Sequence, residues 1–350
     1  MAAGVLVAVD GGNSKTDAAV ATTAGELLAT VRGDGFRPQA AGLDAALDAL
    51  TADIGRALRD AGARADDVVH VAAYLANVDL PGEEERLEKL LLARGAAPSV
   101  AVGNDTFALL RSAVTEGWGV AVVCGAGINC AGVAPDGRTA RFPSLGPHTG
   151  DWGGGGELGR AALWHAIRGE DGRGPETALT AAVAAHFGTA RAIDVGLALH
   201  LGEIDQGRLT ALAPVLLGIA ESGDEAARGV VLRLAEEVAI LGSVALRRLD
   251  LLDAPADVVL GGGVLAARRP LLMDAVADRY AALAPRAQLL VPDDPRSSAP
   301  RSSPSTTSPP RRPPTRRCAP RSAAADPGSG RRRPGTYHDD GRGGRRRRRP

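Results

Sequence analysis

Apolar positions along the first third of the chain follow two different periods. Short runs of strand length alternate with segments in which leucine and isoleucine recur every three or four residues, a spacing typical of amphipathic helices. This alternation predicts an α/β architecture, with parallel strand pairing beyond an opening meander of three strands. The expected strands lie at residues 5–10, 27–32, 68–75 and 100–104, with one more ending at Thr22, and the expected helices at residues 43–58, 83–93 and 106–114.

The next part of the chain begins with the same pattern. Residues 120–124 form an apolar run that ends at a glycine-rich turn, and residues 130–134 and 139–142 are two further strand-like runs. Gly12 follows the first apolar run of residues 5–10, and Gly125 follows the corresponding run of residues 120–124. The repeat predicts two lobes of similar plan, residues 1–115 and residues 116–295. Chance is the alternative, because hairpins with glycine turns are common.

The second lobe is expected to carry a helical insertion between its strands. After the glycine-rich residues 150–156, helical periodicity extends to residue 249 with short interruptions. Short strands are expected at residues 258–260 and 287–291. From residue 296 onward there is no apolar periodicity, and proline, serine, arginine and glycine dominate, so residues 296–350 are predicted to be a disordered tail.

Charge is distributed unevenly along the chain. The formal net charge of the 350 residues is +0 at pH 7. Residues 1–295 nevertheless carry an excess of acidic side chains, whereas residues 296–350 are rich in arginine. The tail arginines, such as those at residues 345–349, are the feature that suggests nucleic-acid binding. We therefore expect no nucleic-acid partner for the core of the protein.

Cysteine usage and hydropathy indicate the compartment. Cys124, Cys130 and Cys318 are too few and too irregularly spaced for a disulfide framework or a zinc site of the CxxC type. The N-terminus has no basic segment or cleavage-like site, and nowhere do 18 apolar residues run together. These features predict a cytoplasmic protein without a membrane partner.

Glycine-rich turns after apolar strands are the candidate nucleotide-binding elements. The first turn places an acid at a strand end and follows it with hydroxyls and a lysine: Asp10, Gly11, Gly12, Asn13, Ser14, Lys15 and Thr16. Successive backbone N–H groups in such a turn can cradle phosphate oxygens, although an ordinary hairpin is the alternative. The second and third candidates are Gly125, Ala126, Gly127 and Asn129, and the strand-to-helix turn Gly261, Gly262 and Gly263.

With these motifs the chain resembles the BadF/BadG/BcrA/BcrD ATPase family, which includes N-acetylglucosamine kinases and belongs to the superfamily of actin, hexokinase and the heat-shock chaperones. The three turns are similar to the family's two phosphate motifs and its adenosine motif, and the resemblance covers about residues 4–295. It implies two ribonuclease-H-like lobes with a nucleotide cleft between them, ATP and Mg²⁺ as cofactors, and phosphorylation of a sugar. A homodimer is an oligomeric state that the resemblance allows.

The resemblance also assigns roles to individual acidic and amide side chains. Asp105 matches the general base that takes the proton of the sugar hydroxyl, and Asn104 beside it matches a substrate-binding residue. Asp10 is expected to hold Mg²⁺ through water. Asp151 matches the aspartate that binds sugar hydroxyls. From the residues alone, Asn104 or Asp105 could instead cap the helix that starts at Thr106.

The sugar-binding positions depart from the family pattern. Arg37 stands where N-acetylglucosamine kinases use Asn, Gln39 stands where an aromatic residue is usual, and Trp152 replaces a Glu. The resemblance therefore implies an amino sugar or another hexose, free glucosamine included, without implying specificity for the N-acetyl group.

Two other functions compete with a sugar kinase. The same family includes ATPases that activate iron–sulfur reductases through cysteine ligands, for which Cys124 and Cys130 are the candidates. A nucleic-acid-binding protein is the second competitor, through the basic tail.

The tail has a further peculiarity at the level of the gene. Residues 296–308 can be back-translated with GC-rich codons so that the neighbouring frame encodes Pro-Val-Val-Gly-Ala-Ala-Leu-Leu-Ala-Leu-Asp-His-Leu, which is similar to the family's last helix. A frameshift near Arg296 would account for the tail, and resequencing the locus tests this hypothesis.

Overall fold

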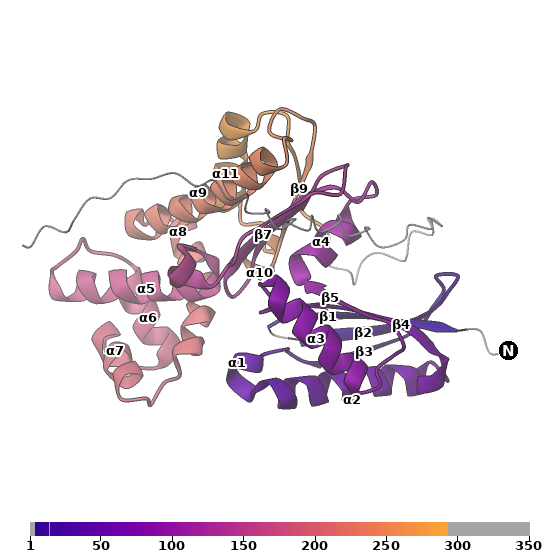
Figure 1. Ribbon diagram of the computed structural model, residues 1–350. Helices are drawn as coiled ribbons and strands as arrows, with labels where there is room; N and C mark the ends of the chain where they lie inside the picture. The colour runs from indigo at the N-terminus through magenta and orange to yellow at the C-terminus, as the bar shows by residue number, and fades with distance from the viewer. Residues whose placement is uncertain (1–3, 14, 293–350) are drawn as a thin grey trace, which may run out of the picture. The chain divides into compact units, whose positions relative to one another are not determined.

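The computed structural model describes residues 4–13 and 15–292 (Figure 1). The predictions made for Ser14, for Cys318 and for the tail at residues 296–350, its disorder and the frameshift included, lie outside the described residues.

The first sheet has five strands in the order β3-β2-β1-β4-β5. The opening three strands are antiparallel neighbours, and the other two continue the sheet in parallel with β1, as the alternation of strands and helices predicts. α2 packs against β2 and β3, and α3 packs beside β5 (Figure 1). The elements are β1 (Val5–Gly11), β2 (Lys15–Thr22), β3 (Leu27–Asp34), α1 (Pro38–Ala41), α2 (Leu43–Asp60), a 3₁₀ turn (Ala65–Asp67), β4 (Val68–Leu75), α3 (Pro81–Ala93), β5 (Val100–Asn104) and α4 (Asp105–Ala113).

The second sheet repeats this plan with the order β10-β9-β6-β7-β8. Read from the other edge, its strands pair as those of the first sheet do: two antiparallel hairpin neighbours on one side of β6 and two parallel strands on the other. The predicted duplication of the α/β plan is confirmed. The strands are β6 (Gly119–Cys124), β7 (Ile128–Val133), β8 (Thr139–Arg141), β9 (Asp257–Gly261) and β10 (Gln288–Leu290).

A group of helices lies between β8 and β9 in the sequence, as expected for the helical insertion. α5 begins at Gly154 rather than at Glu157, because the N–H groups of Gly155 and Gly156 donate to the carbonyls of Gly125 and Ala126. The helices are α5 (Gly154–Asp171), α6 (Leu179–Phe187), α7 (Ala192–His200), α8 (Ala213–Glu221), α9 (Glu225–Arg248), α10 (Gly263–Ala266) and α11 (Pro270–Leu283), with 3₁₀ turns at Gly146–Thr149 and Gln206–Leu212.

Each sheet has its own hydrophobic core, built mainly from Val, Leu, Ile and Ala. Cys124 and Cys130 lie in the core of the second sheet and are 0 % exposed. Burial raises the pKa of the Cys124 thiol to about 12 and raises the pKa of Cys130 as well. Within the described parts of the chain, no helix combines the length and the apolar character that crossing a membrane requires.

Candidate active site

The carboxyl ends of three parallel strands lie level with one another in the first sheet. In the strand register, Gly11 at the end of β1 is opposite Leu75 at the end of β4, and Leu75 is opposite Asn104 at the end of β5. The segments that leave these strands therefore begin side by side, at the edge where α/β proteins place their ligands.

The first glycine turn is joined to two other segments at this edge. The N–H of Gly12 donates to the Lys15 carbonyl at 2.9 Å, and the N–H of Phe36 donates to the Gly12 carbonyl at 2.9 Å. The Asn77 carboxamide donates to Asn13 Oδ1 at 2.8 Å and to the Phe36 carbonyl at 3.0 Å. Asn77, at φ 63°, thus connects the phosphate-loop candidate with the segment that follows β3.

Other residues predicted around this turn differ in how accessible they are. The Lys15 ammonium pairs with Asp17 at 3.4 Å, and Thr16 is only 2 % exposed on β2. Arg37 and Gln39 are exposed, at the start of α1 and within it. Arg37 directly follows Phe36, whose N–H is hydrogen-bonded to the Gly12 carbonyl of the turn.

Asp10, at the end of β1, keeps a solvent-accessible face. Partial burial and, to a smaller extent, the negative charge of Asp17 raise its carboxyl pKa, while Lys15 acts in the opposite direction. A site that disfavours the negative charge of Asp10 in this way would be stabilised by a cation, which fits the prediction that Asp10 lies beside Mg²⁺ and its water ligands.

Asn104 caps α4, and Asp105 is the first residue of the helix. The Asn104 side-chain oxygen Oδ1 accepts from the Thr106 N–H at 3.0 Å, and the side-chain N–H donates to the Val78 backbone carbonyl at 3.1 Å. Asn104 is only 2 % exposed. Burial, with a smaller contribution from the charge of Asp10, raises the pKa of Asp105 to about 6. The cap and the candidate base are therefore neighbouring but different side chains.

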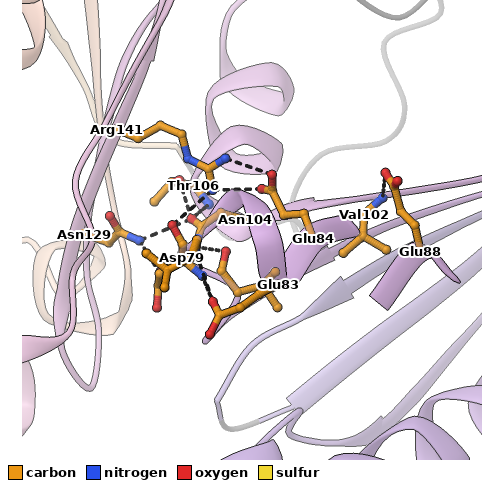
Figure 2. A network of polar contacts seen from close by, with 11 residues as sticks. Asp79, Glu83, Glu84, Glu88, Val102, Asn104, Thr106, Asn129 and Arg141 are labelled. Atoms are coloured by element: carbon orange, nitrogen blue, oxygen red, sulfur yellow. Dashed lines mark hydrogen bonds and ion pairs between the residues drawn. The ribbon is translucent and has the colours of Figure 1, made fainter. Parts of the chain in front are cut away.

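Asp79 is a carboxylate of the site that the sequence analysis missed. Its Oδ1 accepts from the carboxamides of Asn104 and Asn129, each at 2.9 Å (Figure 2). Burial raises its pKa to about 7, helped by the negative charges of Asp105 and Glu83. The signal for it was its place just after β4, the same reasoning that selected Asp105 after β5.

Asn129 links strand β7 to this network. Besides Asp79, its carboxamide reaches Asn104 Oδ1 at 3.3 Å, and its oxygen accepts from the Cys130 N–H at 2.6 Å and from the Ser144 hydroxyl at 2.5 Å. The Asn129 carboxamide thus donates to the network around Asp79, its oxygen accepts from Cys130 and Ser144, and its contact with a phosphate stays a prediction.

The second and third glycine turns meet at one edge of the second sheet. Val123 of β6 is opposite Gly261 of β9 in the register. Gly262 has φ +82°, and a Cβ on it would lie 2.5 Å from the backbone carbonyl of Cys124. Only glycine permits this approach of the two turns.

A cavity of about 490 Å³ opens beside these turns. Its walls include Gly125, Ala126 and Gly263 together with apolar side chains such as Leu217 and Val264. A Cβ added to Gly125, Gly127 or Gly263 would meet nothing within 4 Å, so the backbone of both turns is open to a ligand. The volume and the mixed lining fit a nucleotide.

Asp151 lies in the segment before α5. The Thr149 hydroxyl donates to its carboxylate, and its own N–H donates to the Gly146 carbonyl at 3.0 Å. The Trp152 ring beside it packs under the Arg233 guanidinium, whose carbon lies 4.0 Å from the ring centre. Trp152, which stands where a carboxylate was expected, is therefore held by a residue of α9.

Cys124 and Cys130, the candidate ligands of an iron–sulfur cluster, are both buried. The thiols of Cys124 and Cys130 are enclosed in the core of the second sheet. Over residues 4–13 and 15–292, no group of three or more His, Cys, Asp or Glu side chains has an arrangement that could hold a metal ion. The arginine-rich segment that suggested nucleic-acid binding lies outside these residues.

The sequence matches a known family over most of its length. Residues 7–287 match the model of the BadF/BadG/BcrA/BcrD ATPase family. The N-acetyl-D-glucosamine kinase of Dictyostelium discoideum is 24 % identical over 298 residues, which are 82 % of this chain and 93 % of that protein. An N-acetylmuramic acid/N-acetylglucosamine kinase of Clostridium acetobutylicum is 21 % identical, over 74 % of this chain and 85 % of that protein.

Solved structures share the fold. A candidate N-acetylglucosamine kinase from Chromobacterium violaceum superposes with a TM-score of 0.64 at 23 % identity, covering 82 % of this chain and 94 % of that one. A glucokinase of the ROK family from Streptomyces griseus, solved with glucose and AMPPNP, gives a TM-score of 0.51 at 20 % identity, covering 82 % of this chain and 94 % of that one. These likenesses confirm the two-lobed α/β fold.

Proposed function

The chain belongs to the BadF/BadG/BcrA/BcrD ATPase family, and from this membership we propose that it is an ATP-dependent kinase for a hydroxyl group of an amino sugar or hexose. The observation that carries the proposal is the half-buried Asp105 carboxylate, which begins α4 at the edge where β1, β4 and β5 end level. The sugar kinases among the relatives described above support the same activity.

In this reaction Asp105 acts as the general base. Its carboxylate accepts the proton of the sugar hydroxyl while the hydroxyl oxygen forms a bond to the terminal phosphorus and the bond to ADP breaks. A pKa of about 6 suits this role, because the group is ionised at neutral pH and still has appreciable proton affinity. Asp151 is proposed to bind sugar hydroxyls, as are the exposed Arg37 and Gln39.

The nucleotide is proposed to lie in the glycine-lined cavity. The N–H groups of the Gly12 and Gly125 turns would hold phosphate oxygens, and Gly263 would lie beside the adenosine. Bound Mg²⁺ would neutralise phosphate charge, and Asp10 would hold its water ligands. A coupled assay for ADP release over glucosamine, N-acetylglucosamine and glucose tests the activity. ADP release with none of these sugars contradicts the proposal.

The pH dependence of the reaction follows from the raised pKa of Asp105. The base works in its ionised form, so kcat/KM for glucose, which has no ammonium group, should be constant near neutral pH and fall about tenfold per pH unit below about pH 6. Initial rates between pH 5 and pH 8 measure this limb. Rates that stay constant down to pH 5 would contradict the proposed environment of Asp105.

Gly125→Ala tests the nucleotide cavity. Its Cβ would meet no protein atom within 4 Å but would point into the space where phosphates are expected. We expect the Kd for ATP to rise at least about tenfold, ~1.4 kcal/mol, with little change in Tm. Gly229→Ala on α9, which is also free of steric conflict and does not line the cavity, is the control. Equal ATP affinity in both variants would contradict this placement of the nucleotide.

A further inference from the structure

Asp79 is a carboxylate to which the proposed phosphoryl transfer assigns no role, and only one of its two oxygens has a described hydrogen bond. Both carboxamide donors, from Asn104 and Asn129, bind Oδ1. Within the described part of the chain, Oδ2 accepts no hydrogen bond. It is not among the fully buried polar atoms that lack a partner, so it is in contact with solvent. The two hydrogen bonds to Oδ1 orient the carboxylate, and Oδ2 keeps some solvent exposure.

The charges around Asp79 favour a cation at this oxygen. The negatively charged groups that face it are Asp105 and Glu83, and the positively charged group is Arg141. The Arg141 guanidinium donates to both carboxylate oxygens of Glu84, at 2.8 and 2.9 Å, and to the Asp79 backbone carbonyl at 3.3 Å (Figure 2). It makes no hydrogen bond to the Asp79 carboxylate, so that charge lacks direct pairing. Burial raises the pKa of Asp79 most, and the negative charges of Asp105 and Glu83 raise it further.

We propose that Asp79 binds the ammonium group of the sugar substrate and thereby selects free amino sugars over neutral hexoses and over their N-acetyl forms. The inference rests on the proposed sugar kinase function. An ammonium group supplies both the missing charge and charge-assisted hydrogen bonds, which are about twice as strong as neutral ones. A hydroxyl or acetamide group can donate a hydrogen bond to Oδ2 but leaves the negative charge of this partly buried carboxylate uncompensated.

Asp79→Asn separates the charge of this residue from its shape. An asparagine keeps an oxygen that can accept from Asn104 and Asn129, so the network can form in the variant. The experiment measures kcat/KM of the full-length wild type and variant for glucosamine, glucose and N-acetylglucosamine. We expect the wild type to prefer glucosamine. In the variant, the ratio of kcat/KM for glucosamine to that for glucose should fall about 10- to 100-fold, the range of a charge-assisted hydrogen bond. Asp66→Asn, an exposed aspartate before β4, is the matched control.

The outcomes distinguish this inference from the proposed function. A wild type that phosphorylates glucose or N-acetylglucosamine better than glucosamine would overturn the inference and leave the sugar kinase intact. A variant that loses activity on glucosamine and glucose by the same factor would also overturn it, because Asp79 would then only maintain the site. A Tm for Asp79→Asn close to that of Asp66→Asn identifies a loss of selectivity as a change in recognition. No ADP release with any sugar would instead contradict the kinase function itself.

Discussion

Replacing Asp105 by asparagine is expected to lower kcat about 10²- to 10⁴-fold, the contribution of a positioned general base, while ATP still binds. The variant removes the proton acceptor and keeps the size of the side chain. The helix start is preserved because the cap of α4 is Asn104. A coupled ADP assay measures turnover, and calorimetric titration measures the affinity for ATP.

The stability of this variant provides an internal check. Burial and the charge of Asp10 disfavour the ionised form of Asp105 in the folded protein. A neutral side chain removes that unfavourable interaction, so Tm should stay the same or rise. Asp60→Asn, an exposed aspartate at the end of α2, should leave both turnover and Tm unchanged. Wild-type turnover in Asp105→Asn would refute the assignment of the base.

Replacing Gly262 by alanine is expected to reduce the free energy of unfolding by about 2–5 kcal/mol, the sum of a strained backbone and overpacking. The residue has φ +82°, and its added methyl group would lie 2.5 Å from the Cys124 carbonyl carbon and oxygen. Both atoms belong to the backbone of β6 in the sheet core, so they cannot move aside as a flexible side chain would. Chemical denaturation with urea measures the loss.

The adjacent glycine gives a matched comparison for this prediction. Gly263 begins α10, does not have a positive φ, and has no atom within 4 Å of the position of an added Cβ. Gly263→Ala should therefore unfold at the same urea concentration as the wild type, within a few tenths of a kcal/mol. Equal stability of the Gly262 and Gly263 variants would show that the two turns are not packed as described.

The elements of the fold were predictable because their signals are local. Strand periodicity located β4 at Val68–Leu75, and the repeat of strand and glycine turn led to the expectation of two similar lobes, which the strand orders confirm. The start of α5 was predicted incorrectly. Its first turn, Gly154–Gly156, lacks helix-forming side chains and is stabilised by carbonyls of the Gly125 turn, which no window around residue 154 contains.

For the candidate site, the sequence by itself determined which residues could do the chemistry: an acid at the end of β1, an acid just after β5 and three glycine turns. Only the tertiary structure decided how they combine. It made Asn104 the cap and Asp105 the half-buried carboxylate, and it brought Asp79 and Asn129 into one hydrogen-bond network with Asn104. The physical reason is that hydrophobic period and turn chemistry act over a few residues, whereas the burial and charge of a carboxylate depend on strand register. In this chain the register places Gly11, Leu75 and Asn104 level across the sheet.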